Sequence, residues 1–181
     1  IPVTFLSHTG MFFGRLESTK HINIERQRKQ FKLGEDEEFC LSFSKKIIKS
    51  KIHNQSVILR RYNRHRDIRE ISPIYTQIKN LKNDVNRATT IESIMGYEGN
   101  AARLYFKGLS LLADKDFKFR GRSRMPPRDP FNSLLSLGYT LLLYEAYTAI
   151  ANKGLNPYAG FLHKDRQGHP TLASDLMEEW R

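Results

Sequence analysis

Apolar residues recur at helical spacing from Gly34 onward, and this pattern constrains the fold of the 181-residue chain more than any other feature. Phe39, Phe43 and Ile47 follow one another every four residues, which places them on one face of a helix. The acidic run at 35–38 precedes them, where the dipole at a helix N-terminus favours carboxylates. We therefore predict a mainly α-helical fold for this part of the chain.

Further helices follow along the sequence. Residues 71–85 keep a three- and four-residue apolar spacing, which predicts a second helix. A third begins at Thr89, because Thr89 and Glu92 have the spacing of a capping box. Asp129 is a suitable cap for a fourth helix with Pro130 at its first position. This fourth helix is apolar nearly all round, so we expect it in the centre of the core.

Residues 1–33 follow a different pattern. Two short runs rich in β-forming residues, IPVTFLS and MFFGRL, are separated by a turn signal. Ile22 and Ile24 alternate with polar residues, which predicts a further half-buried strand. Because this is too little sheet to be stable alone, we expect residues 1–33 to end a separate N-terminal β domain, followed by an α-helical domain at 34–181. Both ends look cut, so we expect a piece of a longer protein.

The chain is strongly basic, with a net charge of +11, and this suggests a polyanionic partner. One cluster of Lys and Arg lies at 45–69, and a second lies at 115–128, where it is interleaved with Phe117 and Phe119. Cations neutralise phosphates and aromatic rings stack on unpaired bases. The alternative for each cluster alone is a well-solvated surface, but two clusters together favour nucleic acid. An anionic membrane surface is less favoured, because neither cluster lies on a strongly amphipathic helix.

Composition excludes several classes of protein. Hydrophobic residues make up 39% and charged residues 27%, which excludes collagen, low-complexity disorder and a disulfide-built miniprotein. Cys40 is the single cysteine, so no intramolecular disulfide is expected and a reducing, cytoplasmic location fits. No uninterrupted apolar run approaches the roughly 20 residues of a membrane span, so we expect no membrane partner. Walker, GxGxxG and GxSxG motifs are absent from the sequence.

Glu98 is the first candidate for chemistry. It falls on the apolar face that contains Ile94, and a carboxylate there is costly to bury unless it is paired, protonated or bound to a metal. Gly96 and Gly99 flank it, which suggests a close approach by backbone or ligand. The alternative is a Glu that caps a neighbouring helix or pairs with Arg103.

A final helix, beginning near Thr171, carries Asp175 and Glu178 on one face. Paired carboxylates repel unless a cation lies between them, although acidic residues are also common at the start of a short helix. His163 follows the apolar GFL segment, where a lone His is more often structural than a ligand. One imidazole and two carboxylates would suit Mg²⁺ or Mn²⁺, and the lack of a cysteine in this set argues against structural zinc.

Three segments stand in a distinctive order: GYEGNAARLYF, FRGRSRMPPRDPFNSLLSLGYTLLLYE and GLNPYAGFLHKDRQGHPTLASDLMEEWR. In order and spacing they resemble the CRISPR-associated spacer-acquisition integrase/endonuclease family, CRISPR-associated protein one. KIHNQSVILRR and FLSHTGMFFGRL resemble that family too, so the likeness runs along almost the whole chain. Relative to the family, most of the β domain ahead of Ile1 and the helices expected after Arg181 are absent.

The resemblance implies a β domain used for dimerisation and a helical catalytic domain. It implies a Mg²⁺ or Mn²⁺ site on Glu98, His163 and Glu178, with Asp175 as a supporting acidic residue. None of these positions is substituted, so there is no sign of an inactivated relative. It further implies a group of residues near the DNA path or beside the metal: Arg120, Arg122, Arg124, Asn132, Lys164 and Arg166.

The expected activity is metal-assisted phosphoryl transfer on DNA. A 3′-OH of incoming spacer DNA attacks a phosphate at the end of a CRISPR repeat, and with water as nucleophile the same site cleaves DNA. The partners implied are double-stranded DNA (spacer precursor and repeat), a second copy of the chain and CRISPR-associated protein two. Two alternatives stay open: a non-enzymatic basic DNA-binding scaffold, and a transposon-encoded integrase of the same family.

Overall fold

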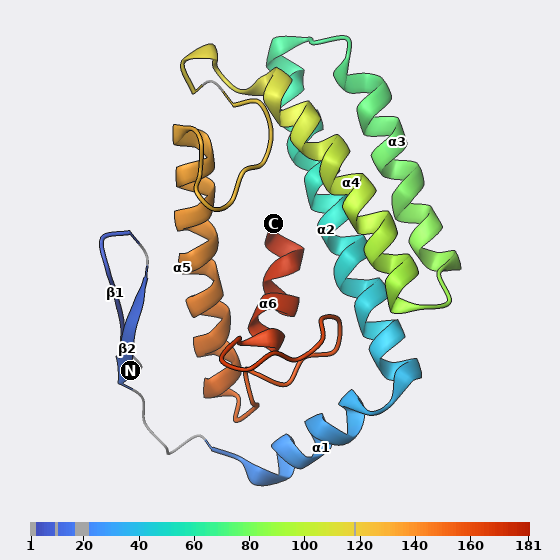
Figure 1. The fold of residues 1–181 in the computed structure, drawn as a ribbon. Coiled ribbons are helices and arrows are strands. Elements are labelled where there is room, and N and C mark those ends of the chain that lie inside the picture. The colour runs from blue at the N-terminus through green and yellow to red at the C-terminus, as the bar shows by residue number, and fades with distance from the viewer. Residues whose placement is uncertain (1–2, 10, 17–21, 118) are drawn as a thin grey trace. The chain divides into compact units, whose positions relative to one another are not determined.

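A computed structural model describes residues 3–9, 11–16, 22–117 and 119–181 of the chain (Figure 1). Parts of the sequence predictions, at Ile1, Pro2, Gly10, His21 and Lys118, lie outside the described residues. The chain divides into two units. The hairpin unit contains residues 1–43 and 137–177, and the bundle unit contains residues 44–136 and 178–181.

The fold is mainly α-helical with one short β-hairpin near the N-terminus, which confirms the predicted fold class. Most of the helices are those that the apolar spacing predicts. The elements are β1 (Val3–Leu6), β2 (Phe12–Leu16), α1 (Ile24–Gly34), α2 (Glu37–Arg66), α3 (Ile71–Asp84), α4 (Ile91–Leu112), α5 (Pro130–Asn152) and α6 (Thr171–Met177), with 3₁₀ turns η1 (Val85–Arg87), η2 (Lys115–Phe117) and η3 (Glu178–Trp180).

The strand predicted around Ile22 and Ile24 is wrong. The β1–β2 hairpin is antiparallel, with Val3 opposite Leu16, and the chain then enters α1 at Ile24. Asn23 caps this helix, because its side-chain oxygen accepts a hydrogen bond from the Arg26 N–H at 3.0 Å. An Asn cap satisfies a backbone donor at the helix start, and this local bond outweighs the short alternation of apolar residues.

Gln30 fastens α1 to the loop after α5 within the hairpin unit. The residue is only 3% exposed. Its amide nitrogen donates to the carbonyl oxygens of Asn156 and Ala159 at 2.8 Å, and its amide oxygen accepts from the Asn156 N–H at 2.8 Å. One buried side chain therefore satisfies three backbone groups of a loop that has no helix or strand of its own to do so.

Aromatic and aliphatic side chains form the core of the hairpin unit around α6. Ile150, Leu172 and Ala173 are buried in it, and half-buried side chains pack against them. Phe161 makes edge-on contacts with Phe39 and Phe43, with ring centroids 5.2 and 5.0 Å apart. This packing fixes the chain at Phe161, two residues before His163.

Three helices, α2, α3 and α4, run side by side in the bundle unit (Figure 1). Their core contains fully buried side chains such as Ile52, Ile78 and Ile94. Gly108 of α4 lies against α2, because a Cβ atom there would come within 2.9 Å of the methyl groups of Leu59. The close contact between the two helices therefore depends on the missing side chain.

Two predicted helix caps have different outcomes. Asp129 caps α5 as predicted, and its carboxylate accepts from the Asn132 N–H at 2.8 Å. The cap of α4 is Thr90, one residue after the predicted Thr89, and its hydroxyl accepts from the Ser93 N–H at 3.2 Å. Both residues of the Thr-Thr pair can cap a helix, so spacing alone does not choose between them.

The expectation that α5 lies in the centre of the core is wrong. Leu134 is 60% exposed and Leu141 is 50% exposed, and most of the helix is at best half-buried among the described residues. By length and composition alone, α5 is a helix that could cross a membrane. The sequence prediction did not identify it, because it looked for an uninterrupted apolar run and Glu145 interrupts this one. Composition does not distinguish such a helix from one that packs against protein.

Replacing Gln30 by Leu tests the fastening of α1. Three backbone groups of the loop at 156–159 would lose their partners, so we expect the free energy of unfolding to fall by about 2 kcal/mol. Urea unfolding followed by circular dichroism measures the change, with Lys29→Leu on the exposed side of α1 as control. Equal stability of both variants would contradict this role of Gln30.

Candidate functional site

Two carboxylates from distant parts of the sequence share one cation in the bundle unit. The ammonium group of Lys51, in α2, donates a hydrogen bond to Glu98 of α4 and another to Glu178 of η3. The side chains of Lys51, Glu98 and Glu178 are 7%, 18% and 5% exposed. Arg181 donates to the second oxygen of Glu178. The cluster is therefore a largely buried set of two negative and two positive groups.

The charges explain why the cluster tolerates burial. Burial by itself raises the pKa of the Glu178 carboxyl, but the positive charges of Lys51 and Arg181 outweigh it and hold that pKa below its ordinary value. Glu178 is therefore ionised at neutral pH. A buried carboxylate of this kind requires a cation beside it, since an unpaired buried charge is strongly unfavourable.

The role of Lys51 was not predicted from the sequence, where the residue belongs to the basic cluster at 45–69. Lys51 is buried, and it lies on the same stripe of α2 as Ile47, Ile48 and Ile52. The sequence feature that could have indicated burial of Lys51 is its position one helical turn after Ile47, on the apolar face of the helix. The suggested pairing of Glu98 with Arg103 is not the one the structure has, because Lys51 pairs with Glu98.

Gly96 and Gly99 leave space beside Glu98. A Cβ atom at either position would meet no described atom within 4 Å. The close approach by backbone that these glycines suggested is therefore not made by the described part of the chain. The surface of α4 around Glu98 is left without side chains at these two positions, which suits a ligand that comes close to the helix backbone.

Asp175 organises the segment that carries His163, within the hairpin unit. Its side chain is fully buried. One carboxylate oxygen accepts from the N–H groups of Phe161 and Leu162 at 2.7 and 2.9 Å. The other oxygen lies 2.8 Å from Nδ1 of His163 and accepts from its backbone N–H at 3.2 Å. Four contacts from one carboxylate thus fix this turn.

The contact with Asp175 assigns the tautomer of His163. A carboxylate only accepts hydrogen bonds, so Nδ1 of the neutral imidazole carries the proton and Nε2 carries the lone pair. Metal-binding histidines characteristically donate one ring N–H to a carboxylate in this way, which fixes the orientation of the ring. Asp175 is therefore a positioning residue for His163.

Gly160 allows the chain to pass close to α6 at this turn. A Cβ atom at Gly160 would lie 2.5 Å from the methyl group of Thr171 and 2.7 Å from a carboxylate oxygen of Asp175. Thr171 and Asp175 are both fully buried, so neither can move aside. Only glycine fits at this position.

The residues predicted near the DNA path or beside the metal fall into two groups. Asn132 is fully buried; it accepts from Arg122 and the Ser123 N–H and donates to Gly121 and Asp129. Arg122 also donates to Ser136. These two side chains hold the 121–129 loop together. The remaining members are exposed on the surface: Arg120, Arg124, Lys164 and Arg166.

The structure thus places the three expected metal ligands and the supporting residue Asp175 in two pairs. Glu98 and Glu178 meet in the bundle unit, and His163 and Asp175 meet in the hairpin unit. Within the ranges that the structure describes, no group of three or more His, Cys, Asp or Glu side chains is arranged to hold a metal ion. The predicted three-residue ligand set stays a prediction.

The whole chain matches one family of CRISPR-associated proteins. The family model described as CRISPR associated protein Cas1 matches residues 1–181, the whole chain. The chain therefore belongs to the Cas1 family, which confirms the resemblance seen in its sequence.

The chain spans about half the length of the curated relatives that it matches. The CRISPR-associated endonuclease Cas1 of Mycobacterium tuberculosis is 42% identical over 175 residues, which are 95% of this chain and 50% of the relative. A Cas1 endonuclease of Thermus thermophilus is 39% identical over 181 residues, which are 100% of this chain and 52% of the relative.

Solved structures match nearly the full chain. A chain of a Cas6-RT-Cas1–Cas2 complex has a TM-score of 0.86 and 34% identity, and it covers 99% of this chain and 20% of its own. A casposase bound to integration product has a TM-score of 0.77 and 28% identity, with coverage of 99% and 50%. A Cas1 protein from Thermotoga maritima, at 24% identity and a TM-score of 0.82, covers 99% of this chain and 56% of its own and shares the fold.

Replacing Lys51 by Met tests the shared cation. The variant keeps the length of the side chain but leaves the Glu98–Glu178 pair without the ammonium group, so we expect the free energy of unfolding to fall by about 3 kcal/mol. Urea unfolding at neutral pH with EDTA measures the change. Lys46→Met, at an exposed position of the same helix, is the control and should change stability little. Similar losses in both variants would argue against the shared cation.

The lowered pKa of Glu178 predicts a loss of stability in acid. A carboxyl group with a lowered folded-state pKa contributes fully above its ordinary value of about 4.5, and this contribution disappears as the pH falls through the lowered value. We expect the stability difference between the native chain and the Glu178→Gln variant to narrow below about pH 4.5. Denaturant titrations with EDTA between about pH 6 and pH 3 measure it. A difference that stays constant with pH would contradict the assignment.

Proposed function

We propose that the chain is the helical catalytic part of a metal-dependent DNA endonuclease and integrase of CRISPR adaptation. The observation that supports this most directly is the convergence of Glu98 and Glu178 on one positive charge. Relatives at 42% and 39% identity are named CRISPR-associated endonuclease Cas1. A structural neighbour with the same fold is a casposase bound to its integration product.

Glu98, Glu178 and His163 are the proposed ligands of Mg²⁺ or Mn²⁺. Two carboxylates that already share a cation have the charge to attract a divalent ion, and oxygen ligands with one imidazole suit these metals. When bound, such a metal stabilises negative charge that develops on phosphate oxygens. Asp175 holds the imidazole of His163 in the tautomer that can act as a ligand through Nε2.

The proposed reaction is a transesterification on DNA. A 3′-hydroxyl of the incoming DNA gives up its proton and forms a bond to phosphorus at the repeat end. The bond from phosphorus to the neighbouring 3′-oxygen breaks, and that oxygen takes up a proton. Water in place of the hydroxyl gives cleavage. The exposed cations, among them Arg120, Arg124 and Arg166, bind the negatively charged backbone and orient it.

The proposed partners follow from the same family. Double-stranded DNA, as spacer precursor and CRISPR repeat, is the substrate, and CRISPR-associated protein two and a second copy of the chain complete the assembly. Complexes of Cas1 with Cas2 are among the solved structures that match this fold. The casposase neighbour supports one variant of this proposal, a transposon-encoded integrase with the same chemistry and different DNA ends.

Replacing Glu98 by Ala tests the proposal. We expect Mn²⁺-dependent DNA cleavage to fall by at least about 100-fold, because one ligand of the ion that stabilises the transition state is lost. DNA binding in EDTA should change little. Cleavage is followed on a labelled duplex, with Glu92→Ala at an exposed position of the same helix as control.

Two outcomes would contradict the proposal. Undiminished cleavage by the Glu98→Ala variant would exclude Glu98 from the site. DNA binding with no metal-dependent cleavage by the native chain, together with no effect of His163→Ala, would favour the non-enzymatic scaffold instead.

A further inference from the structure

Gln55 contains a buried hydrogen-bond acceptor for which the described part of the chain provides no donor. The residue lies in α2 and is only 2% exposed. Its amide nitrogen donates to the carbonyl oxygen of Arg181 at 3.2 Å, which assigns the orientation of the amide group, because a flipped amide would bring two oxygens together. Its amide oxygen has no hydrogen-bond partner among the described residues. Such an acceptor is unfavourable in the interior of a protein, so its presence requires an explanation.

Lys51 is the neighbouring cation on the same face of α2. Residues four apart in a helix lie one turn from each other, so the side chains of Lys51 and Gln55 are neighbours. Both residues are buried. The ammonium group has three N–H donors on a flexible stem, and it donates to Glu98 and Glu178. A change of rotamer, without a shift of α2, would bring it to the oxygen of Gln55.

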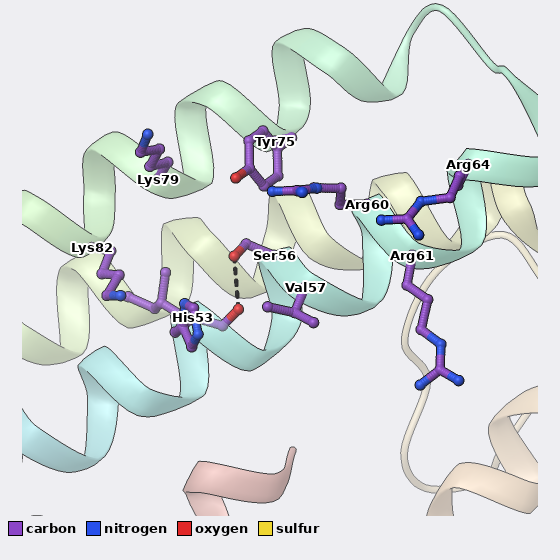
Figure 2. A pocket seen from close by; sticks show the side chains of 10 residues that line it. His53, Ser56, Val57, Arg60, Arg61, Arg64, Tyr75, Lys79 and Lys82 are labelled. Carbon is purple, nitrogen blue, oxygen red and sulfur yellow. Dashed lines mark hydrogen bonds between the residues drawn. The ribbon is translucent and has the colours of Figure 1, made fainter.

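This face of α2 is separate from the cavity on the other side of the helix. A cavity of about 530 Å³ between α2 and α3 is lined on α2 by His53, Ser56 and Arg60, among others (Figure 2). Its lining includes neither Lys51 nor Gln55. Successive residues of a helix are about 100° apart, which turns His53 and Arg60 away from Gln55. Water in this cavity therefore does not supply the donor that the Gln55 oxygen lacks.

A divalent ion that binds both carboxylates would take the position of the ammonium group. Lys51 contacts one oxygen of Glu98 and one of Glu178, and Arg181 contacts the second oxygen of Glu178. The two carboxylates are therefore already matched by two cations. A divalent ion added to this set would leave an excess of positive charge in a largely buried cluster unless one cation withdraws. Lys51 bridges the two carboxylates, so it is the cation in the way of the ion.

We propose that Lys51 is the exchangeable cation of the metal site and that Gln55 receives its ammonium group when a divalent ion binds. The proposal rests on the proposed function, because it takes Glu98 and Glu178 as ligands of the ion. It adds two states of the bundle unit to that function. In the metal-free state the ammonium group holds the carboxylates together. In the loaded state it donates to the oxygen of Gln55, which then has the partner that it otherwise lacks.

Contacts other than the shared cation keep Glu178 in place during this exchange. Asn54 of α2 donates to the carbonyl oxygen of Glu179 at 2.8 Å, and Gln55 donates to that of Arg181. These two bonds hold the chain directly after Glu178 on α2. Release of the ammonium group would therefore leave the carboxylate where it is, and the exchange needs only the movement of a side chain.

The exchange also explains how the site would select a divalent ion. A monovalent ion brings the same charge as the ammonium group that it would displace, so it gains little from the carboxylates. A divalent ion brings twice that charge and interacts about twice as strongly at the same distance. Lys51 thus stabilises the metal-free site and excludes monovalent ions from it, and in return it lowers the affinity of the native chain for the divalent ion.

The first experiment removes the exchangeable cation. Binding of Mn²⁺ to the intact chain is measured by isothermal titration calorimetry at constant pH and salt, without DNA. Lys51→Met should raise the affinity for Mn²⁺ by about 10-fold or more, because the ion no longer displaces a competitor. Arg181→Met is the control. It removes the same charge from beside Glu178 but does not open the position between the carboxylates, so it should raise the affinity less.

The second experiment removes the acceptor. Gln55→Leu should lower the affinity for Mn²⁺ by about 10-fold, because the displaced ammonium group is left without a partner. The same substitution in the Lys51→Met background should have no effect, since no ammonium group remains to be received. Asn54→Leu is the control, because it also removes a bond from α2 to the chain after Glu178. Any effect of Asn54→Leu should be the same in both backgrounds.

Thermal unfolding provides a second measurement that depends neither on activity nor on the heat of binding. A bound ion raises Tm in line with its affinity, so the increase on addition of Mn²⁺ should be largest for Lys51→Met and smallest for Gln55→Leu. Unfolding curves in EDTA show which variants are folded, and Lys51→Gln replaces Lys51→Met if that variant does not fold.

The outcomes separate the exchange from the proposed function. A native chain that binds no Mn²⁺, or binds it equally well after Glu98→Ala, would overturn the proposed metal site and the exchange with it. Binding that requires Glu98 but increases no more in Lys51→Met than in Arg181→Met would overturn the exchange and leave the metal site standing. A loss from Gln55→Leu that persists in the Lys51→Met background would overturn Gln55 as the acceptor.

Discussion

The ammonium group of Lys51 is the interaction on which the candidate site depends. It lets α2, α4 and η3 bring two carboxylates together in a largely buried position, where their mutual repulsion would otherwise separate them. The same arrangement is suited to binding a cation, since a pair of carboxylates that requires one positive charge can also attract a divalent ion. Stability and proposed catalysis therefore place opposite demands on Lys51. It satisfies the carboxylates when no metal is bound, and a metal ion would compete with it for them.

The histidine is organised by a different principle. Asp175 uses backbone N–H groups and one ring nitrogen to define both the path of the chain and the tautomer of His163. None of this involves a second charged partner. The carboxylate cluster of the bundle unit is thus held by ion pairs and the histidine of the hairpin unit by hydrogen bonds, so salt should affect the two groups differently.

Much of the fold could be predicted from apolar spacing, because α2, α3 and α4 each bury one regular face. The predictions of secondary structure and burial were wrong where apolar spacing or composition did not determine the local structure. Asn23 starts a helix where Ile22 and Ile24 alternate, and the apolar composition of α5 does not show which of its faces is covered. At the site, Glu98 stood out because carboxylates are rarely buried on apolar faces, and Asp175 stood out because it shares a helix face with Glu178. Lys51 did not stand out, since its partners are 47 and 127 positions away and only tertiary structure brings them together.

Gly160 shows how a residue that is needed only for packing can be essential for activity. Its missing side chain leaves room for Thr171 and for the carboxylate of Asp175, and neither can yield. Any larger residue there would push Asp175 away from the His163 turn. A mutational screen scored by activity would class Gly160 with the proposed metal ligands, although glycine has no side-chain group that can bind an ion or move a proton. The glycine of the GFLH segment therefore marks the geometry of the turn and not its chemistry.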